Sequence, residues 1–282
     1  MVCDPTGGVA LETIAIIEGL IVCFLLGIVS LKLRFVDLSG FAAAFIIGVL
    51  IFAVPPDGWK WFVVILIFHV VAAQFTKYKY VMKRRMGFAQ EKGGARAWPN
   101  IVANGGFAAL FALGEGLWPS GLWVMGFLGA VATATADTLA TEIGLLNPAE
   151  PRMITNLHRK VAAGTSGGIS PFGELATLLG SLIIGLAAWL LRVAKLDVYP
   201  MGMILLIILL AGLVGCTIDS LIGATIQGMF KCAVCGRTTE SKKHCGRSTQ
   251  RIRGSGIIDN NMVNFISTGV GALSSVIVFL LL

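Results

Sequence analysis

Long apolar runs separated by short polar segments dominate the pattern of hydrophobic positions along this chain. Eight runs can be followed, over residues 11–31, 38–54, 59–75, 100–113, 117–144, 171–193, 201–227 and 262–282. A helix of about 20 mostly apolar residues crosses a bilayer and satisfies all its backbone groups internally. The pattern therefore predicts an all-α, polytopic membrane protein with about eight transmembrane helices, forming one integral-membrane domain over residues 1–282.

The distribution of basic residues predicts the orientation of these helices. The loops after the first, third, fifth and seventh runs would share one side of the membrane. That side holds all of the 22 Lys and Arg residues except Lys60, Arg192 and Lys195. Basic loops of membrane proteins stay in the cytoplasm. We therefore expect these loops to be cytoplasmic, both termini to lie outside, and the protein to reside in the cell membrane.

The composition narrows the classes of partner. Charged residues make up 13% of the chain, against about 25% in a soluble domain. The formal net charge is nevertheless +7. In a membrane protein, such an excess of Lys and Arg belongs to cytoplasmic loops, anionic headgroups and phosphates. We therefore expect no nucleic-acid partner, and the oligomeric state is left open.

Acidic residues mark the cytoplasmic end of the fifth run. Asp137 and Glu142 lie there, and Asp219 occupies a similar motif, TIDSL against TADTL, near the end of the seventh run. Mg²⁺ takes one or two carboxylates together with substrate phosphates. Asp137 and Glu142 are about 140° apart on a regular helix, so only fraying would let both face one ion. The main interpretation is a Mg²⁺ site at Asp137 and Asp219, and the alternative is that each acid pairs with a loop Arg or Lys.

A turn of small residues follows in the loop after the fifth run. It comprises Gly164, Thr165, Ser166, Gly167 and Gly168, and a run with Pro near its start comes next. Glycines let backbone N–H groups approach an anion, and a helix N-terminus favours negative charge. The turn is either a phosphate cradle or a plain connector. The basic residues before it favour the cradle; they are Arg152, His158, Arg159 and Lys160.

Asparagine residues form two further groups on the predicted cytoplasmic side. Arg96 precedes Asn100 and Asn104, which share one helical face, and Asn260, Asn261 and Asn264 open the last run. Buried amides in a membrane helix need partners. Helix pairing explains any one of them, whereas two groups together favour a polar cavity.

The loop over residues 228–262 contains the ligand types of a tetrahedral zinc site. These are Cys232, Cys235, His244 and Cys245. A CxxC pair is a frequent half-site for zinc, whereas the adjacent His-Cys pair is less regular. Structural zinc is one interpretation, and a redox or incidental thiol cluster is the other.

Five motifs, in this order, resemble a known family: ARAWPNIVANG, TADTLATEIG, AAGTSGGISPFGE, TIDSLIGATIQG and IDNNMVN. They resemble the integral-membrane family that includes plant chloroplast phytyl-phosphate kinase and the transmembrane protein 19-like proteins. The Cys/His loop looks like the version found in archaea and some bacteria. The resemblance implies phosphorylation of a membrane isoprenoid monophosphate to the diphosphate, with CTP as co-substrate and Mg²⁺. The family is also distantly similar to dolichol kinases and CDP-diacylglycerol synthases.

These observations predict an enzyme that works on a lipid phosphate and a nucleotide. The main hypothesis is a CTP-dependent prenyl-phosphate kinase, and the alternatives are a cytidylyltransferase that forms a CDP-lipid and a lipid-phosphate transporter or flippase. The expected catalytic residues are Asp137, Glu142 and Asp219. The expected substrate- and phosphate-binding residues are Arg96, Asn100, Asn104, Thr138, His158, Arg159, Lys160, Gly164, Thr165, Ser166, Gly167, Gly168, Gln227, Asn260, Asn261 and Asn264.

Overall fold

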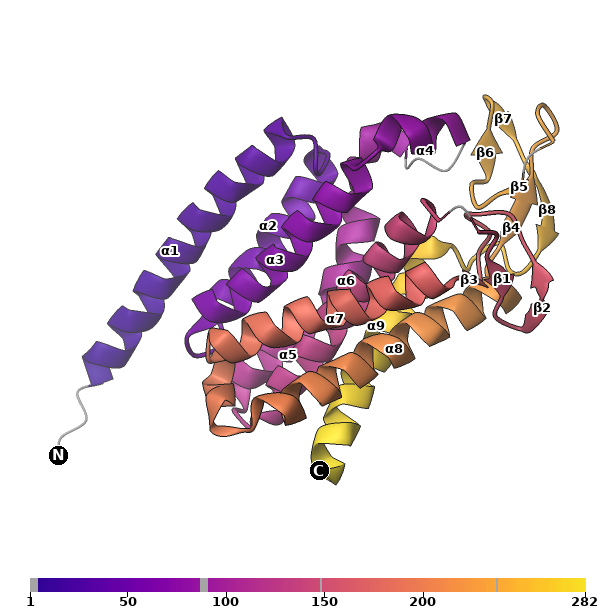
Figure 1. The fold of residues 1–282 in the computed structure, drawn as a ribbon. Helices are drawn as coiled ribbons and strands as arrows, with labels where there is room; N and C mark the ends of the chain where they lie inside the picture. Colours follow the sequence, from indigo (N-terminus) through magenta and orange to yellow (C-terminus); the bar gives the residue numbers. More distant parts are fainter. Residues whose placement is uncertain (1–4, 87–90, 148, 237) are drawn as a thin grey trace.

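The computed structural model describes residues 5–86, 91–147, 149–236 and 238–282, and it is mainly helical (Figure 1). The helices are α1 (Pro5–Lys32), α2 (Leu38–Ala53), α3 (Gly58–Lys77), α4 (Tyr80–Met86), α5 (Trp98–Leu117), α6 (Leu122–Gly144), α7 (Pro171–Leu190), α8 (Met201–Thr225) and α9 (Asn260–Leu281), with two 3₁₀ turns, η1 (Glu91–Gly94) and η2 (Val193–Val198). Each expected apolar run lies largely on one of the long helices.

Six helices in the described part of the chain are long and apolar enough to cross a membrane: α1, α3, α6, α7, α8 and α9. The apolar helix α2 has 16 residues, and α5 carries Asn100, Asn104 and Glu115. The prediction of a helical, multi-span protein is therefore supported, while the number of eight crossings stays a prediction.

The long helices run back and forth between two ends of the molecule. The start of α1 and the end of α9 lie at one end, and α4 and the β-strands gather at the other (Figure 1). This arrangement fits the predicted alternation of loops, since the strands lie in the loops after α6 and α8. The strand-bearing end is the one for which the basic residues predict a cytoplasmic location.

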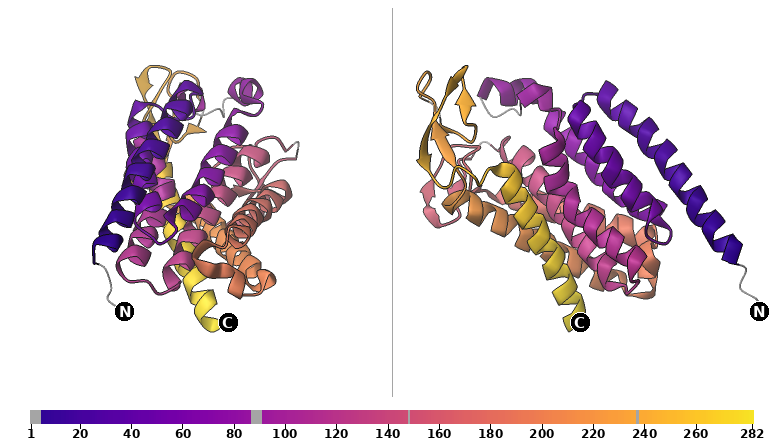
Figure 2. Two further views of the ribbon diagram at one scale, coloured as in Figure 1. Left: turned by 90° about the vertical axis from the view of Figure 1, so that its left-hand side faces the viewer. Right: turned by 180° about the vertical axis from the view of Figure 1, so that it is seen from behind.

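Helix α6 occupies the centre of the bundle and packs against α3, α5, α7, α8 and α9. In the most apolar stretch of α6, 83% of the residues are buried, against 11% in α1. Small residues permit this close packing: a Cβ added at Gly129 would lie 2.5 Å from the Gly271 oxygen of α9. Helices in membranes associate through such close approaches. Helix α1, by contrast, is the outermost helix and packs mainly on α2 (Figure 2).

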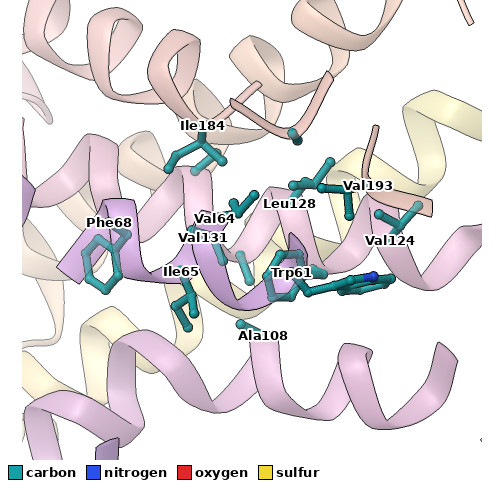
Figure 3. Close-up of a cluster of buried hydrophobic side chains, with 14 of the residues drawn as sticks. Trp61, Val64, Ile65, Phe68, Ala108, Val124, Leu128, Val131, Ile184 and Val193 are labelled. Atoms are coloured by element: carbon teal, nitrogen blue, oxygen red, sulfur yellow. The ribbon is translucent and has the colours of Figure 1, made fainter. Parts of the chain in front are cut away.

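Apolar side chains from several helices fill the middle of the bundle (Figure 3). The Trp61 and Phe127 rings lie 4.8 Å apart between α3 and α6. Leu128 and Ile184 are fully buried beside them. This packing fixes α6 among its neighbouring helices, and α6 carries Asp137 nearer its strand-bearing end.

In the described part of the chain, eight short strands accompany the helices, which corrects the expectation of an all-α chain. One antiparallel sheet has the order β2-β1-β3 and comprises β1 (Arg152–Met153), β2 (Asn156–Lys160) and β3 (Gly168–Ile169). A second antiparallel sheet has the order β5-β4-β8 and comprises β4 (Met229–Lys231), β5 (Thr238–Thr239) and β8 (Gln250–Arg253). A hairpin pairs β6 (Lys243–His244) with β7 (Arg247–Ser248). Most of these strands have only two to four residues, too few for an alternating pattern to be visible in the sequence.

Candidate functional site

Two carboxylates, one on α6 and one on α8, lie near enough for their charges to interact. Asp137 and Asp219 are both half-buried, and their charges act on one another. The Asp219 Oδ2 atom accepts a hydrogen bond of 3.1 Å from the hydroxyl of Ser267 on α9. The helices can approach closely because a Cβ at Gly215 would lie 2.3 Å from Thr133 Cγ2. The structure thus brings together the two acids that the similar TADTL and TIDSL motifs singled out.

The backbone of Arg96 is fixed to the connection between α1 and α2. Arg96 N–H donates to the Phe35 oxygen at 3.0 Å, and Asp37 N–H donates to the Arg96 oxygen at 3.0 Å. A parallel bridge joins Val36 and Arg96. These bonds determine where the Arg96 side chain enters the bundle.

Arg96 is buried close to the carboxylates of Glu142 and Asp137 on α6. It is 5% exposed, and its Cζ lies 5.8 Å from the centre of the Phe68 ring. Burial lowers the pKa of Arg96 from its ordinary value, and the carboxylates of Glu142 and Asp137 oppose that shift. Arg96 is therefore a buried cation held close to two carboxylates.

Several buried polar atoms around Arg96 have no hydrogen-bond partner within the described residues. They are Arg96 Nε, Asn100 Oδ1 and Asn264 Oδ1. The two asparagine groups meet here, since Asn264 Nδ2 donates to Asn104 Oδ1 at 3.5 Å and Asn104 Nδ2 donates to the Asn100 oxygen at 2.9 Å. Buried polar atoms are nearly always paired. The unpaired ones indicate that this region receives a polar ligand or water.

A pocket extends from Arg96 into the apolar region between α1, α2, α3 and α5. Its atom-free space is about 750 Å³, open solvent at its mouth included. Its walls are apolar side chains such as Leu26, Phe45 and Leu66. Its polar lining residues are Ser30, His69, Arg96, Asn100 and Asn104. Among them, His69 pairs through Nε2 with the Ser30 hydroxyl at 3.1 Å.

Glu142 has the alternative role that the sequence left open. Its carboxylate forms a buried ion pair with Lys83 of α4. Helix α6 continues regularly to Gly144, so no fraying turns Glu142 toward the same side as Asp137. The expectation of Glu142 as a catalytic residue is therefore not supported by its contacts.

The turn of small residues lies against the end of α8. Gly167 has φ +81°, and a Cβ there would lie 2.5 Å from the Ala224 Cβ. The Thr165 hydroxyl donates to the Ala162 oxygen, and Gly168 N–H donates to the Thr165 oxygen. The turn does not lead directly into α7, because β3 intervenes and the Ser170 hydroxyl caps that helix by accepting from Gly173 N–H.

Glu240 is a site residue that sequence reasoning missed. Its carboxylate accepts a hydrogen bond from the Ser166 hydroxyl of the turn, and its charge acts on Asp137 and Asp219. Burial raises the pKa of Glu240, and the bond from Ser166 lowers it in part. Glu240 lies in the Cys/His loop, 21 positions beyond Asp219, with no motif around it. Only the folding of that loop against the turn brings it to the acids.

Other predicted residues lie elsewhere or form local bonds. His158, Arg159 and Lys160 lie on the exposed strand β2, and Lys160 pairs with Glu150 at 3.5 Å. Thr138 donates to the Ala134 oxygen of its own helix. Gln227 is buried with Nε2 unpaired among the described residues. Gly164 has φ +76°, Asn260 is exposed and Asn261 is half-buried.

The four candidate zinc ligands come together in space. One ligand atom from each of Cys232, Cys235, His244 and Cys245 lies within 4.8 Å of all the others. Hydrogen bonds from the Cys235 and Val234 backbone lower the pKa of Cys232 to about 6, which favours the thiolate that binds metals. The donor set of three sulfurs and one imidazole suits zinc.

Comparison with known proteins decides the family. A family model described as "Integral membrane protein DUF92" matches residues 21–272. The chain belongs to the DUF92 family. This family is the one that the ordered motifs predicted, and the prediction is confirmed. The DUF92 match also makes the chain an integral membrane protein, as its apolar helices indicate.

Three curated relatives of this DUF92 chain illustrate the range of similarity. "Protein PGR" of Arabidopsis thaliana is 30% identical over 277 residues, covering 89% of this chain and 92% of the relative. An uncharacterized membrane protein of Methanocaldococcus jannaschii is 28% identical, and the match covers 92% of this chain and 92% of the relative. "Protein VTE6, chloroplastic" of Arabidopsis thaliana is 28% identical over 152 residues, 52% of this chain and 44% of the relative. No solved structure matches the chain.

Proposed function

We propose that this protein is a kinase that transfers a phosphoryl group from a nucleoside triphosphate, CTP by the family resemblance, to a membrane isoprenoid monophosphate. One observation carries the proposal. An apolar pocket between lipid-facing helices ends at the buried cation Arg96, and Arg96 lies close to Asp137 of α6, whose charge also acts on Asp219 of α8. Such a pocket suits a lipid with an apolar chain and an anionic head.

The pocket accounts for the lipid part of the substrate. Helix α1 packs mainly on α2 and exposes apolar side chains, so an isoprenoid chain can reach the pocket from the bilayer. The unpaired Arg96 Nε would donate to the phosphate at the polar end. A guanidinium binds phosphate oxygens through charge-assisted hydrogen bonds.

The two neighbouring carboxylates would supply the metal site that such a kinase needs. Two half-buried acids that act on one another repel unless a cation lies between them, and oxygen donors of this kind fit Mg²⁺. Asp137 and Asp219 would hold the ion. When bound, Mg²⁺ would offset the negative charge of the nucleotide phosphates.

The reaction itself needs no nucleophile from the protein. An oxygen of the lipid monophosphate attacks the γ-phosphorus, the bond from that phosphorus to the bridging oxygen breaks, and the nucleoside diphosphate leaves. Catalysis of this kind is mainly positioning and charge neutralisation. Arg96 would orient the attacking phosphate, and the turn around Ser166 would bind the donor.

The test uses purified full-length protein reconstituted in lipid, labelled phytyl or geranylgeranyl monophosphate, and a panel of nucleoside triphosphates with Mg²⁺. We expect the lipid diphosphate and one equivalent of nucleoside diphosphate, with no product from Asp137→Asn. Release of pyrophosphate together with a CDP-lipid would instead identify a cytidylyltransferase. Movement of the lipid phosphate across vesicles without nucleotide turnover would identify a transporter.

A further inference from the structure

The four-ligand group of the Cys/His loop has the separations of a tetrahedral metal site. Bonds of about 2.3 Å to sulfur and about 2.0 Å to nitrogen separate neighbouring ligand atoms by roughly 3.5–3.8 Å. His244 Nδ1 lies 3.5 Å from Cys235 Sγ and 3.3 Å from Cys245 Sγ. All four ligand atoms lie within 4.8 Å of one another, so a metal requires only small adjustments.

The backbone around the four ligands is also folded in a way that favours metal binding. Val234 N–H donates to Cys232 Sγ at 3.4 Å, and Gly236 N–H donates to the Cys232 oxygen at 2.9 Å. Gly236 has φ +70°, which makes a tight turn after the CxxC pair. On the other side, Cys245 and Gly246 also have positive φ, and they turn the hairpin between β6 and β7. Backbone N–H groups aimed at sulfur stabilise thiolates.

Glu240 lies in the segment that these ligands enclose. It follows β5 and precedes His244, so Cys235 and His244 bracket it in the chain. Strand β5 has two residues and, among the residues that the structure describes, pairs with β4 alone, which is little support for a buried carboxylate. Glu240 nevertheless accepts the hydrogen bond from Ser166 of the turn.

We propose that Cys232, Cys235, His244 and Cys245 bind one structural Zn²⁺, and that this ion holds the loop so that Glu240 reaches Ser166 beside Asp137 and Asp219. All four positions are filled by protein, which is the arrangement of a structural rather than a catalytic zinc. The metal site does not rest on the proposed kinase reaction, because metal content and loop order are measured without lipid or nucleotide.

The first experiment measures metal in the full-length protein, purified in detergent without chelator. We expect about one zinc per chain in the wild type, less than a tenth of that in Cys232→Ser/Cys235→Ser, and an unchanged value in the thiol control Cys23→Ala. Replacement by Co²⁺ should give the visible absorption of a tetrahedral thiolate complex. Metal-free wild type after incubation with Zn²⁺, iron as the bound metal, or full zinc in the double variant would each overturn the site.

The second experiment tests the link to the turn by hydrogen exchange. Stripping zinc from the wild type should increase exchange both in residues 238–244 and in the turn at 164–168, and restoring Zn²⁺ should reverse both effects. Glu240→Gln should keep its zinc and increase exchange in the turn alone. Unchanged exchange in the turn after stripping would overturn the positioning role of the metal. Loss of zinc in Glu240→Gln would also overturn it, because Glu240 is not a ligand.

Discussion

Lys83 of α4 and Glu142 of α6 form an ion pair in which both side chains are almost completely buried. Lys83 also donates to the Phe75 oxygen of α3 at 2.8 Å. The pair therefore ties the short helix α4 to α3 and to the end of α6. Because Glu142 is neutralised by Lys83, Asp137 and Asp219 remain as the carboxylates for a metal.

The first prediction concerns this pair. Lys83→Met leaves Glu142 buried without a counter-charge, and breaking such a pair costs about 3–5 kcal/mol. We expect the free energy of unfolding to fall by that amount in a denaturant titration in mixed micelles, and to recover in part in Lys83→Met/Glu142→Gln. The matched control is Lys60→Met, because the Lys60–Asp57 pair is partly exposed and such pairs contribute less than about 1 kcal/mol. Equal losses in Lys83→Met and Lys60→Met would contradict the structural role of the pair.

Much of the helical framework could be predicted from the sequence, because apolar runs of helix length have few other folds in a bilayer. The approach of Asp137 and Asp219 was also visible, since similar motifs end two runs that point the same way. The asparagines of α5 and α9 were each expected to line a polar cavity, and Asn104 and Asn264 are in fact bonded to one another.

What could not be predicted depends on loops whose position only the folded chain determines. Lys83 is one of many basic residues in the loops predicted to be cytoplasmic, and its burial follows from where α4 lies. Glu240 reaches the site because it follows strand β5, which pairs with β4. A strand of two residues is too short to leave an alternating pattern in the sequence. Arg159 and Lys160 were expected at the phosphates because they precede the turn, yet β2 holds them on an exposed strand.

The second prediction concerns the acids. Asp137→Asn and Asp219→Asn keep the side-chain shape and remove the charge that would hold Mg²⁺, so we expect turnover to fall at least about 100-fold in each. The unfolding curve should stay close to that of the wild type. The control is Asp197→Asn, which removes a carboxylate from a surface pair with Arg192. Near-normal turnover in both site variants would end the metal assignment.

The third prediction concerns the backbone contact that positions Arg96. A Cβ at Gly40 would lie 2.1 Å from the Arg96 oxygen, so Gly40→Ala should displace Arg96 from the pocket. Loss of a hydrogen bond to a charged group costs about 1.5–3 kcal/mol, and we expect the KM for the lipid phosphate to rise about tenfold or more. Gly202→Ala is the matched control, because nothing lies within 4 Å of its added Cβ. If both variants bind the lipid alike, Arg96 does not hold its phosphate.

The fourth prediction concerns the turn of small residues. Gly167→Ala introduces a Cβ at φ +81° and 2.5 Å from the Ala224 Cβ, whereas Gly121→Ala has φ +69° and nothing within 4 Å. Both variants bear backbone strain, but only the first overpacks the turn against α8, which costs about 1–3 kcal/mol more. We expect Gly167→Ala to lose that stability and to raise the KM for the nucleotide. Indistinguishable thermal unfolding of the two variants would show that the turn is free to move away from α8.

The fifth prediction concerns pH and Glu240. Burial raises the pKa of Glu240 and the charge of Asp259 adds to this, while the hydrogen bond from Ser166 opposes it. A carboxyl whose folded pKa is raised binds its proton more tightly in the folded state than in the unfolded state. Its contribution to stability is therefore complete below the ordinary glutamate value and is lost as the pH rises through the raised folded value. Glu240→Gln removes this titration.

The difference in unfolding free energy between the wild type and Glu240→Gln should accordingly change with pH in that window, with the wild type losing stability relative to the variant as the pH increases. Comparing the two proteins cancels the contribution of every other titrating group that Glu240 does not influence. The control is Glu150→Gln, since Glu150 and its partner Lys160 are both largely exposed; its curve should run parallel to the wild type. A wild type that instead gains stability over Glu240→Gln with rising pH would mean that the Glu240 carboxylate is stabilised in the folded state, and the burial beside Ser166 could not then be its dominant environment.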